Sequence, residues 1–178
     1  MGGITMNIFV LDNDPMVAAS FLDDYRLNKM ITETAQIFRA ALGANGFTDD
    51  MCLEHGVLTK SGTTWKITHK NHPVVLWAGE CKENLEWLYN YALGLHNEYL
   101  ERYGRQHASI PPILKMGEFK DMLPSLGCRT WFRQCMPDEY KHNDVVYAYR
   151  RYYKSKQNSK RGVLYRKGDV PYWWEMVE

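Results

Sequence analysis

Residues 22–37 read LDDYRLNKMITETAQI, and their core-facing positions recur at the spacing of a helix. These positions lie three or four residues apart and continue to residue 41: Leu27, Met30, Ile31, Thr34, Phe38 and Ala41. Upstream, Asn13-Asp14-Pro15 offers an N-cap followed by a proline suited to the first helical turn, and Gly43 offers a stop. We therefore expect one long helix over residues 15–42.

A polar stripe runs beside the apolar one on this helix, and it consists of Arg26, Lys29, Glu33 and Gln36. Spacings of three, four and three put these side chains on one face, at the edge of the core. A half-desolvated carboxylate between cations can bind phosphate, act as an acid or base, or activate an amine nucleophile. The simpler interpretation is a solvated helix face with surface ion pairs.

The rest of the chain predicts further helices joined by long loops. Residues 43–71 are rich in Gly, Asp, Thr and Ser and indicate a long loop, and Pro73 can open a second long helix that ends at Gly104. A short helix is expected over 116–123 and a last one from about residue 137. We expect an all-α fold, a single compact domain over 1–178 with an N-terminal extension at 1–5 and a basic, aromatic segment at 141–178.

Two histidines precede the second long helix. His69 and His72 could assist as hydrogen-bond donor or acid near a helix N-terminus, or simply cap their own turn. They lack a further ligand at a diagnostic spacing, so we predict no metal site and no cofactor. Arg102 and His107, at the end of that helix, either complement its dipole or reach a phosphate backbone.

Composition excludes several classes of protein. No apolar run in the 178 residues approaches the length of a membrane span, and the start of the chain does not resemble a secretory signal. The four cysteines show no CxxC spacing, so we expect free thiols in a reducing compartment, and hence a cytoplasmic protein. P-loop, GxGxxG, GxSxG and HExxH patterns are absent.

Positive charge is concentrated near the C-terminus, although the net charge is only +1. Nine Lys or Arg residues lie between positions 141 and 167, opposed only by Asp144. We expect Arg150, Arg151 and Lys154 in particular to neutralise DNA phosphates, with tyrosine rings available for stacking. The alternative is a helix with solvated cations and buried tyrosines.

The first helix resembles that of the pyrimidine-dimer DNA glycosylase family. The similarity lies in Leu22-Asp23-Asp24-Tyr25-Arg26-Leu27-Asn28-Lys29-Met30 with Glu33, Gln36 and Ile37, and in a Trp, a His-Pro pair and a second Trp further on. In this chain the first Trp, the His-Pro pair and the second Trp would be Trp65, His72-Pro73 and Trp77. The resemblance therefore covers roughly residues 6–105. The C-terminal third resembles small phage proteins of unassigned function.

This resemblance implies an all-α enzyme that excises damaged bases from duplex DNA. In the family an N-terminal α-amine forms a Schiff base with the sugar and the strand is then cleaved, while an Arg in a Tyr-Arg pair contacts DNA. Arg26 would take that role. The phage type carries its catalytic Glu directly after this Arg, where the present chain has Leu27, and Met1–Thr5 extend the start.

Our leading hypothesis is a DNA glycosylase or abasic-site lyase acting on damaged or modified pyrimidines. Glu33 would act at the sugar, Lys29 or the N-terminus would be the amine, and His72 would assist. Substrate-binding residues would be Arg26, Gln36, His69, Trp65, Trp77, Arg102, His107 and the three C-terminal cations. Two alternatives remain: a non-catalytic module that binds DNA or a host protein, and an enzyme acting on a free nucleotide.

Overall fold

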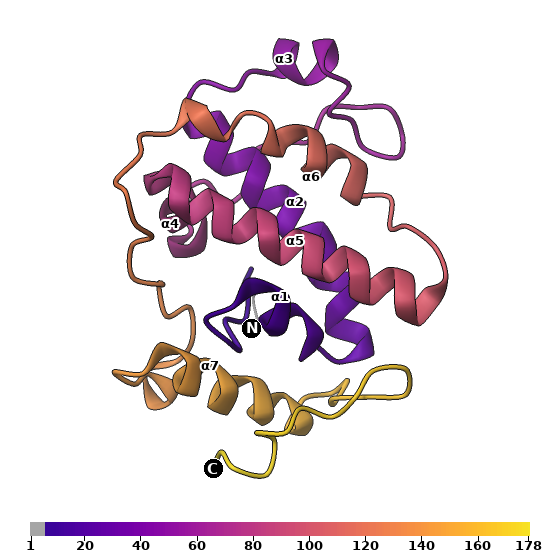
Figure 1. Ribbon diagram of the computed structural model, residues 1–178, viewed down its shortest axis with the longest axis vertical. Helices are drawn as coiled ribbons and strands as arrows, with labels where there is room; N and C mark the ends of the chain where they lie inside the picture. The colour runs from indigo at the N-terminus through magenta and orange to yellow at the C-terminus, as the bar shows by residue number, and fades with distance from the viewer. Residues whose placement is uncertain (1–5) are drawn as a thin grey trace.

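The computed structural model describes residues 6–178 and is all-α over that range, as the sequence predicts (Figure 1). The helices are α1 (Pro15–Ser20), α2 (Asp24–Ala44), α3 (Asp49–Glu54), α4 (Pro73–Glu80), α5 (Lys82–Tyr103), α6 (Ile110–Gly117) and α7 (Val145–Lys154), with 3-10 helices η1 (Lys120–Met122), η2 (Asp138–Tyr140) and η3 (Ser155–Asn158). The one isolated β-bridge among these residues joins Leu58 and Thr64. No helix among them is long and apolar enough to cross a bilayer.

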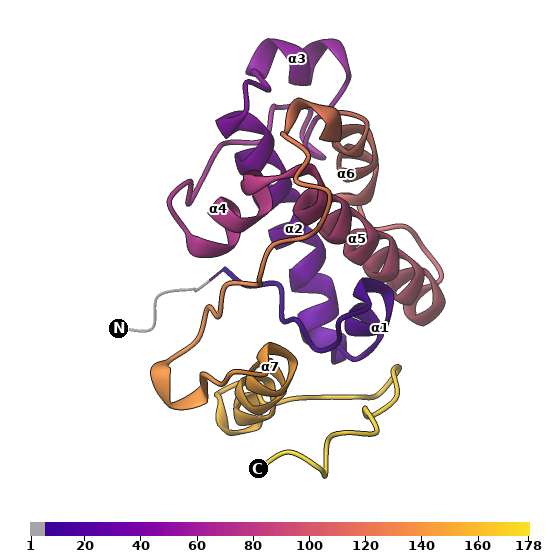
Figure 2. The same cartoon turned by 60° about the vertical axis from the view of Figure 1, so that its left-hand side comes forward.

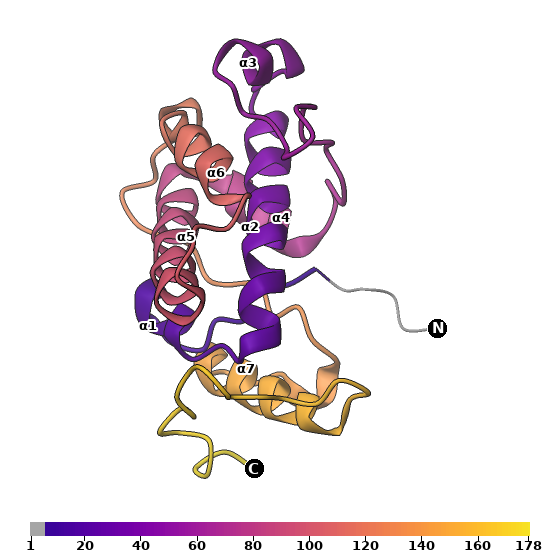
Figure 3. The ribbon, with the colours of Figure 1, turned by 90° about the vertical axis from the view of Figure 1, so that its right-hand side faces the viewer.

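The two long helices α2 and α5 pack against each other and form the centre of the core (Figure 3). Helix α4 covers one side of α2, α1 lies along α5, and α7 lies below them in Figure 1. The segment from Met6 to Leu11 is irregular, with a positive φ of 43° at Phe9, and it is buried. The polar edge of α2 therefore faces the place where the N-terminal segment enters the fold.

The predicted helix over 15–42 is divided, because Asp23 caps a new helix. Its carboxylate accepts hydrogen bonds from the backbone N–H groups of Tyr25 and Arg26, so α2 starts at Asp24. Asp14 caps α1 in the same way, with Pro15 in the first turn as expected.

The second predicted helix is also divided, at Cys81, which is extended with φ −156° and ψ 163°. Asn84 stabilises the break, since its amide donates to the Trp77 carbonyl at 2.6 Å and its oxygen accepts from Thr130 N. Pro111 and Pro112 occupy the first turn of α6, and the predicted helix over 116–123 is replaced by the end of α6 and η1. The last helix begins at Val145, later than predicted.

Candidate active site

An ion pair between Lys29 and Glu33 lies at the edge of α2. Lys29 Nζ is 2.9 Å from Glu33 Oε1, with the lysine side chain 33% exposed and the glutamate side chain 8% exposed. The second carboxylate oxygen accepts a hydrogen bond from the backbone N–H of Asn7 at 3.3 Å. The carboxylate is thus buried and held between the helix and the N-terminal segment, while the lysine reaches solvent.

Burial raises the pKa of Glu33 above its ordinary value of 4.5, and this effect exceeds the opposing influence of Lys29, Asn7 N–H and His69. Tyr91 of α5 lies close enough for the Glu33 charge to add to the burial that raises the pKa of its phenol. The Tyr91 hydroxyl is buried and has no hydrogen-bond partner among residues 6–178. A carboxyl group with a raised pKa can take and return a proton at a pH closer to neutrality.

His72 is the N-cap of α4, and its ring is fixed by that role. Its Nδ1 accepts from Val74 N at 3.3 Å, so the neutral ring carries its proton on Nε2. Burial, followed by the charge of His69, lowers the pKa of His72 and favours this neutral form. His72 therefore presents an N–H donor near neutral pH.

His69 completes the group, because its charge acts on both Glu33 and His72. Its φ of 54° is unusual for a residue other than glycine, and its carbonyl accepts from His72 N at 2.7 Å. The structure thus pairs Lys29 with Glu33 and places His69 near enough for its charge to influence both Glu33 and His72.

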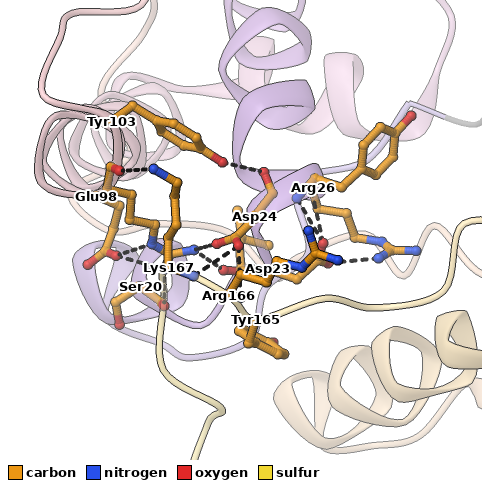
Figure 4. A network of polar contacts seen from close by, with 12 residues as sticks. Ser20, Asp23, Asp24, Arg26, Glu98, Tyr103, Tyr165, Arg166 and Lys167 are labelled. Carbon is orange, nitrogen blue, oxygen red and sulfur yellow. Dashed lines mark hydrogen bonds and ion pairs between the residues drawn. The ribbon is translucent and has the colours of Figure 1, made fainter.

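Arg26 belongs to a network that ties the C-terminal segment to α2 (Figure 4). Its guanidinium binds Asp23 Oδ2 at 2.7 Å and the Gly162 carbonyl at 3.0 Å, and it lies over the Tyr153 ring. Asp23 is fully buried and also accepts from the Tyr153 hydroxyl at 2.6 Å. Arg26 therefore holds the fold together, and its predicted role as a phosphate ligand does not fit this geometry.

Arg102 is likewise bound to groups within the fold. It donates to the carbonyls of Leu22 and Ser20 at 2.7 and 3.1 Å and pairs with Glu98 at 2.8 Å. With only 2% of its side chain exposed, it satisfies the end of α1 rather than reaching a phosphate.

The three cations predicted to bind DNA on α7 are also engaged internally. Arg150 donates to the Leu11 carbonyl at 2.8 Å and pairs with Asp12 at 3.2 Å. Arg151 donates to the Glu139 carbonyl, and Lys154 to that of Val177 at 2.7 Å. Each charge is used to attach α7 to a neighbouring segment.

The remaining predicted residues do not join the site as ligands. Trp77 is fully buried against Phe132, and His107 lies beyond the far end of α5, where its Nδ1 accepts from Ser109 N. Trp65 is partly buried, with an indole N–H that lacks a partner among the described residues. Gln36 lies one turn beyond Glu33, half-buried.

Comparison with known families identifies the family of this chain. The family model described as pyrimidine dimer DNA glycosylase matches residues 6–111, which is more than half of the 178 residues. The chain belongs to the pyrimidine dimer DNA glycosylase family. This membership supports a DNA glycosylase type of enzyme activity and a DNA substrate. Searches of curated proteins and of solved structures gave no match.

Leu27, which stands where the phage type of this family is expected to carry its carboxylate, is fully buried in the core. Glu33 is a buried carboxylate on the same helix, more than one turn further along. The N-terminal amine implied by the family lies outside the described residues 6–178.

The sequence did not predict two residues of the candidate site, Asn7 and Tyr91. Asn7 is a polar residue within the apolar run at 6–11, and that interruption was the available signal. Tyr91 follows the apolar spacing of α5 and offered no signal. No cluster of three or more His, Cys, Asp or Glu side chains in the described part of the chain is arranged to hold a metal ion.

Proposed function

We propose that this protein is a DNA glycosylase with lyase activity that acts on pyrimidine lesions in duplex DNA, with Glu33 as its acid–base and Lys29 as its amine. The single observation that carries this proposal is the buried Glu33 carboxylate, paired at 2.9 Å with a partly exposed lysine. A merely solvated ion pair does not explain why the carboxylate is desolvated and also bound by Asn7 N–H.

The chemistry needs a neutral amine and a proton donor. Glu33 takes a proton from the Lys29 ammonium, and the neutral amine attacks C1′ of the deoxyribose. The C1′–N bond breaks, and the departing base leaves with that electron pair and takes the amine's second proton. Glu33 then returns its proton to O4′ as the sugar ring opens, which leaves an iminium between Lys29 and C1′.

Phosphate contacts are assigned to exposed cations near this pair. Lys70 follows His69 directly and is exposed. Arg161 lies over the Tyr25 ring with its guanidinium 4.5 Å from the centroid, and Tyr25 precedes Lys29 by four residues on α2. We expect these two side chains to contact phosphates in place of the cations that the fold uses internally.

Borohydride trapping tests the proposal. The wild-type chain is incubated with duplexes carrying a pyrimidine dimer, reduced, and the adduct is mapped by mass spectrometry. We expect an adduct on Lys29, which is lost in Lys29→Ala and retained in Lys66→Ala, an exposed lysine outside the ion pair. No adduct on any lesion duplex would remove the Schiff-base proposal, and an adduct that persists in Lys29→Ala would assign the amine elsewhere.

A further inference from the structure

An irregular strip, residues 123–137, joins η1 to η2 along the left edge of Figure 1. It displays Trp131, which is 85% exposed, more than any other large apolar side chain among residues 6–178. The other five tryptophans are buried or half-buried. An exposed indole of this kind points to a binding partner, because an aromatic ring contributes most when its faces are covered.

The residues on both sides of Trp131 are anchored to the body of the protein. Thr130 N donates to Asn84 Oδ1 at 2.9 Å, and Asn84 Nδ2 lies 2.8 Å from the Thr130 hydroxyl oxygen. Phe132 is 7% exposed and packs on Trp77, with ring centroids 5.0 Å apart. Trp131 is therefore held between two fixed neighbours, with its own ring in solvent.

Positive charge accompanies this ring. The strip contains two arginines, Arg129 and Arg133, and no acidic residue. Arg133 pairs with Glu80 of α4, whereas Arg129 has no carboxylate partner among residues 6–178 and donates to the Thr130 carbonyl at 2.8 Å. A planar ring beside an uncompensated guanidinium matches a nucleic acid, which offers bases for stacking and phosphates for ion pairing.

The strip leads from Trp131 to the candidate active site. Four residues beyond Trp131, the Cys135 carbonyl accepts from Asn7 Nδ2 at 2.8 Å, and Asn7 N donates to Glu33. Four residues of chain span at most about 14 Å. Because a duplex rises about 3.4 Å per base pair, a duplex bound at Glu33 that follows the strip would meet Trp131 within about one helical turn.

We propose that Trp131 inserts at a base step of the bound duplex, to one side of the lesion, and stacks on the neighbouring base pair while Arg129 binds the adjacent phosphate. This inference rests on the proposed function for the identity of the ligand. Apolar side chains that enter a base step bend the duplex and bring more of it against the protein. Residues 123–137 lie beyond the family match, which ends at 111, so this contact belongs to a part of the chain that the family model does not describe.

Equilibrium binding to a duplex with a reduced abasic site, which cannot form a Schiff base, tests this contact without turnover. We expect Trp131→Ala to weaken binding by about tenfold or more, and Trp131→Phe, which keeps a ring, to lose less. Met176→Ala, at a side chain that is 73% exposed, is the matched control and should bind like wild type. Arg129→Gln should lower the slope of log Kd against log salt by about one phosphate contact, whereas Trp131→Ala should leave that slope unchanged.

Duplex binding should also shield the wild-type protein from acrylamide quenching, because Trp131 is the one exposed tryptophan among residues 6–178. Wild-type affinity in Trp131→Ala, or unchanged quenching at saturating duplex, would overturn the inference. An equal loss in Trp131→Phe and Trp131→Ala would overturn it as well, since a ring would then not be what the duplex contacts. The proposed function survives these results if the wild type forms a borohydride adduct with abasic-site DNA. A wild type that neither binds a duplex nor forms an adduct would remove both.

Discussion

At the scale of single residues, the sequence predicted the polar stripe of α2. It did not predict which side chains of the stripe would pair with each other and which would be bound by other segments. Lys29 and Glu33 turn toward the N-terminal segment, whereas Arg26 is buried against Asp23 and Gly162. Helical spacing places side chains on a common face, but it does not say which neighbour will cover each one. That depends on Asn7 and on residues 160–167, which are distant in the sequence.

Replacing Glu33 with Gln should separate activity from stability. Because the folded pKa of Glu33 is raised above 4.5, the folded state binds this proton more tightly than the unfolded state does. The free energy of unfolding of the wild type therefore falls as pH rises above 4.5 through the folded pKa. We expect Glu33→Gln to lack this loss and to be at least as stable as wild type at pH 7, by denaturant unfolding across pH. Lower stability at neutral pH would show that the carboxylate is structural.

His72 can be tested with a matched pair of substitutions. Asn is a good N-cap and Ala is not, so His72→Ala should lose about 1 kcal/mol of stability while His72→Asn keeps it. The wild type should lose stability as pH falls below 6.5, because the folded pKa of His72 is lowered, and both variants should lack that loss. If the Nε2–H of His72 donates to the substrate, both variants should slow base release. Normal release by His72→Asn would leave His72 only a cap.

At the scale of elements, the sequence predicted the helical segments but not the breaks within them. Apolar spacing continues across Phe21–Asp23 and across Cys81, so periodicity alone indicated two uninterrupted helices. The breaks depend on distant partners, since Arg102 binds the carbonyls at the end of α1 and Asn84 joins the end of α4 to Thr130. Such long-range polar contacts are invisible to a local pattern.

Gly94 lets α1 approach α5 closely. A Cβ built there would lie 2.8 Å from the Cβ of Ala19 and 3.0 Å from the Cα of Met16. We expect Gly94→Ala to destabilise by about 1–3 kcal/mol through overpacking, partly offset by the helix propensity of alanine. Gly79→Ala, whose new atom would meet its nearest neighbour at 3.5 Å, is the control and should be neutral or slightly stabilising in thermal unfolding. Equal effects would argue against this helix contact.

At the scale of the whole molecule, the C-terminal third is attached to the helices of the family match by polar contacts. Asp24 accepts from the backbone N–H groups of Arg166 and Lys167 (Figure 4), and Asp23 accepts from the Tyr153 hydroxyl. The first described residues lie between α4 and α7 (Figure 2). We expect residues 6–178 to unfold as one unit, because these contacts join the two parts.

Tyr153→Phe tests this coupling. Removing the hydroxyl takes away one donor to the buried Asp23 carboxylate, which Arg26 still binds, and leaves the Asp23 N–H without an acceptor, which should cost about 1–3 kcal/mol. Thermal unfolding should still show a single transition at a lower temperature, and Tyr172→Phe, at an exposed ring, should change little. Two separate transitions would contradict the single unit.

The most direct test of the central claim is the single-turnover rate of base release from a pyrimidine-dimer duplex by wild type, Glu33→Gln and Glu101→Gln. Glu101 is an exposed carboxylate on α5 and serves as the control. A buried acid–base at Glu33 predicts a loss of about 100-fold or more in Glu33→Gln and none in Glu101→Gln. Base release by Glu33→Gln at the wild-type rate would contradict it.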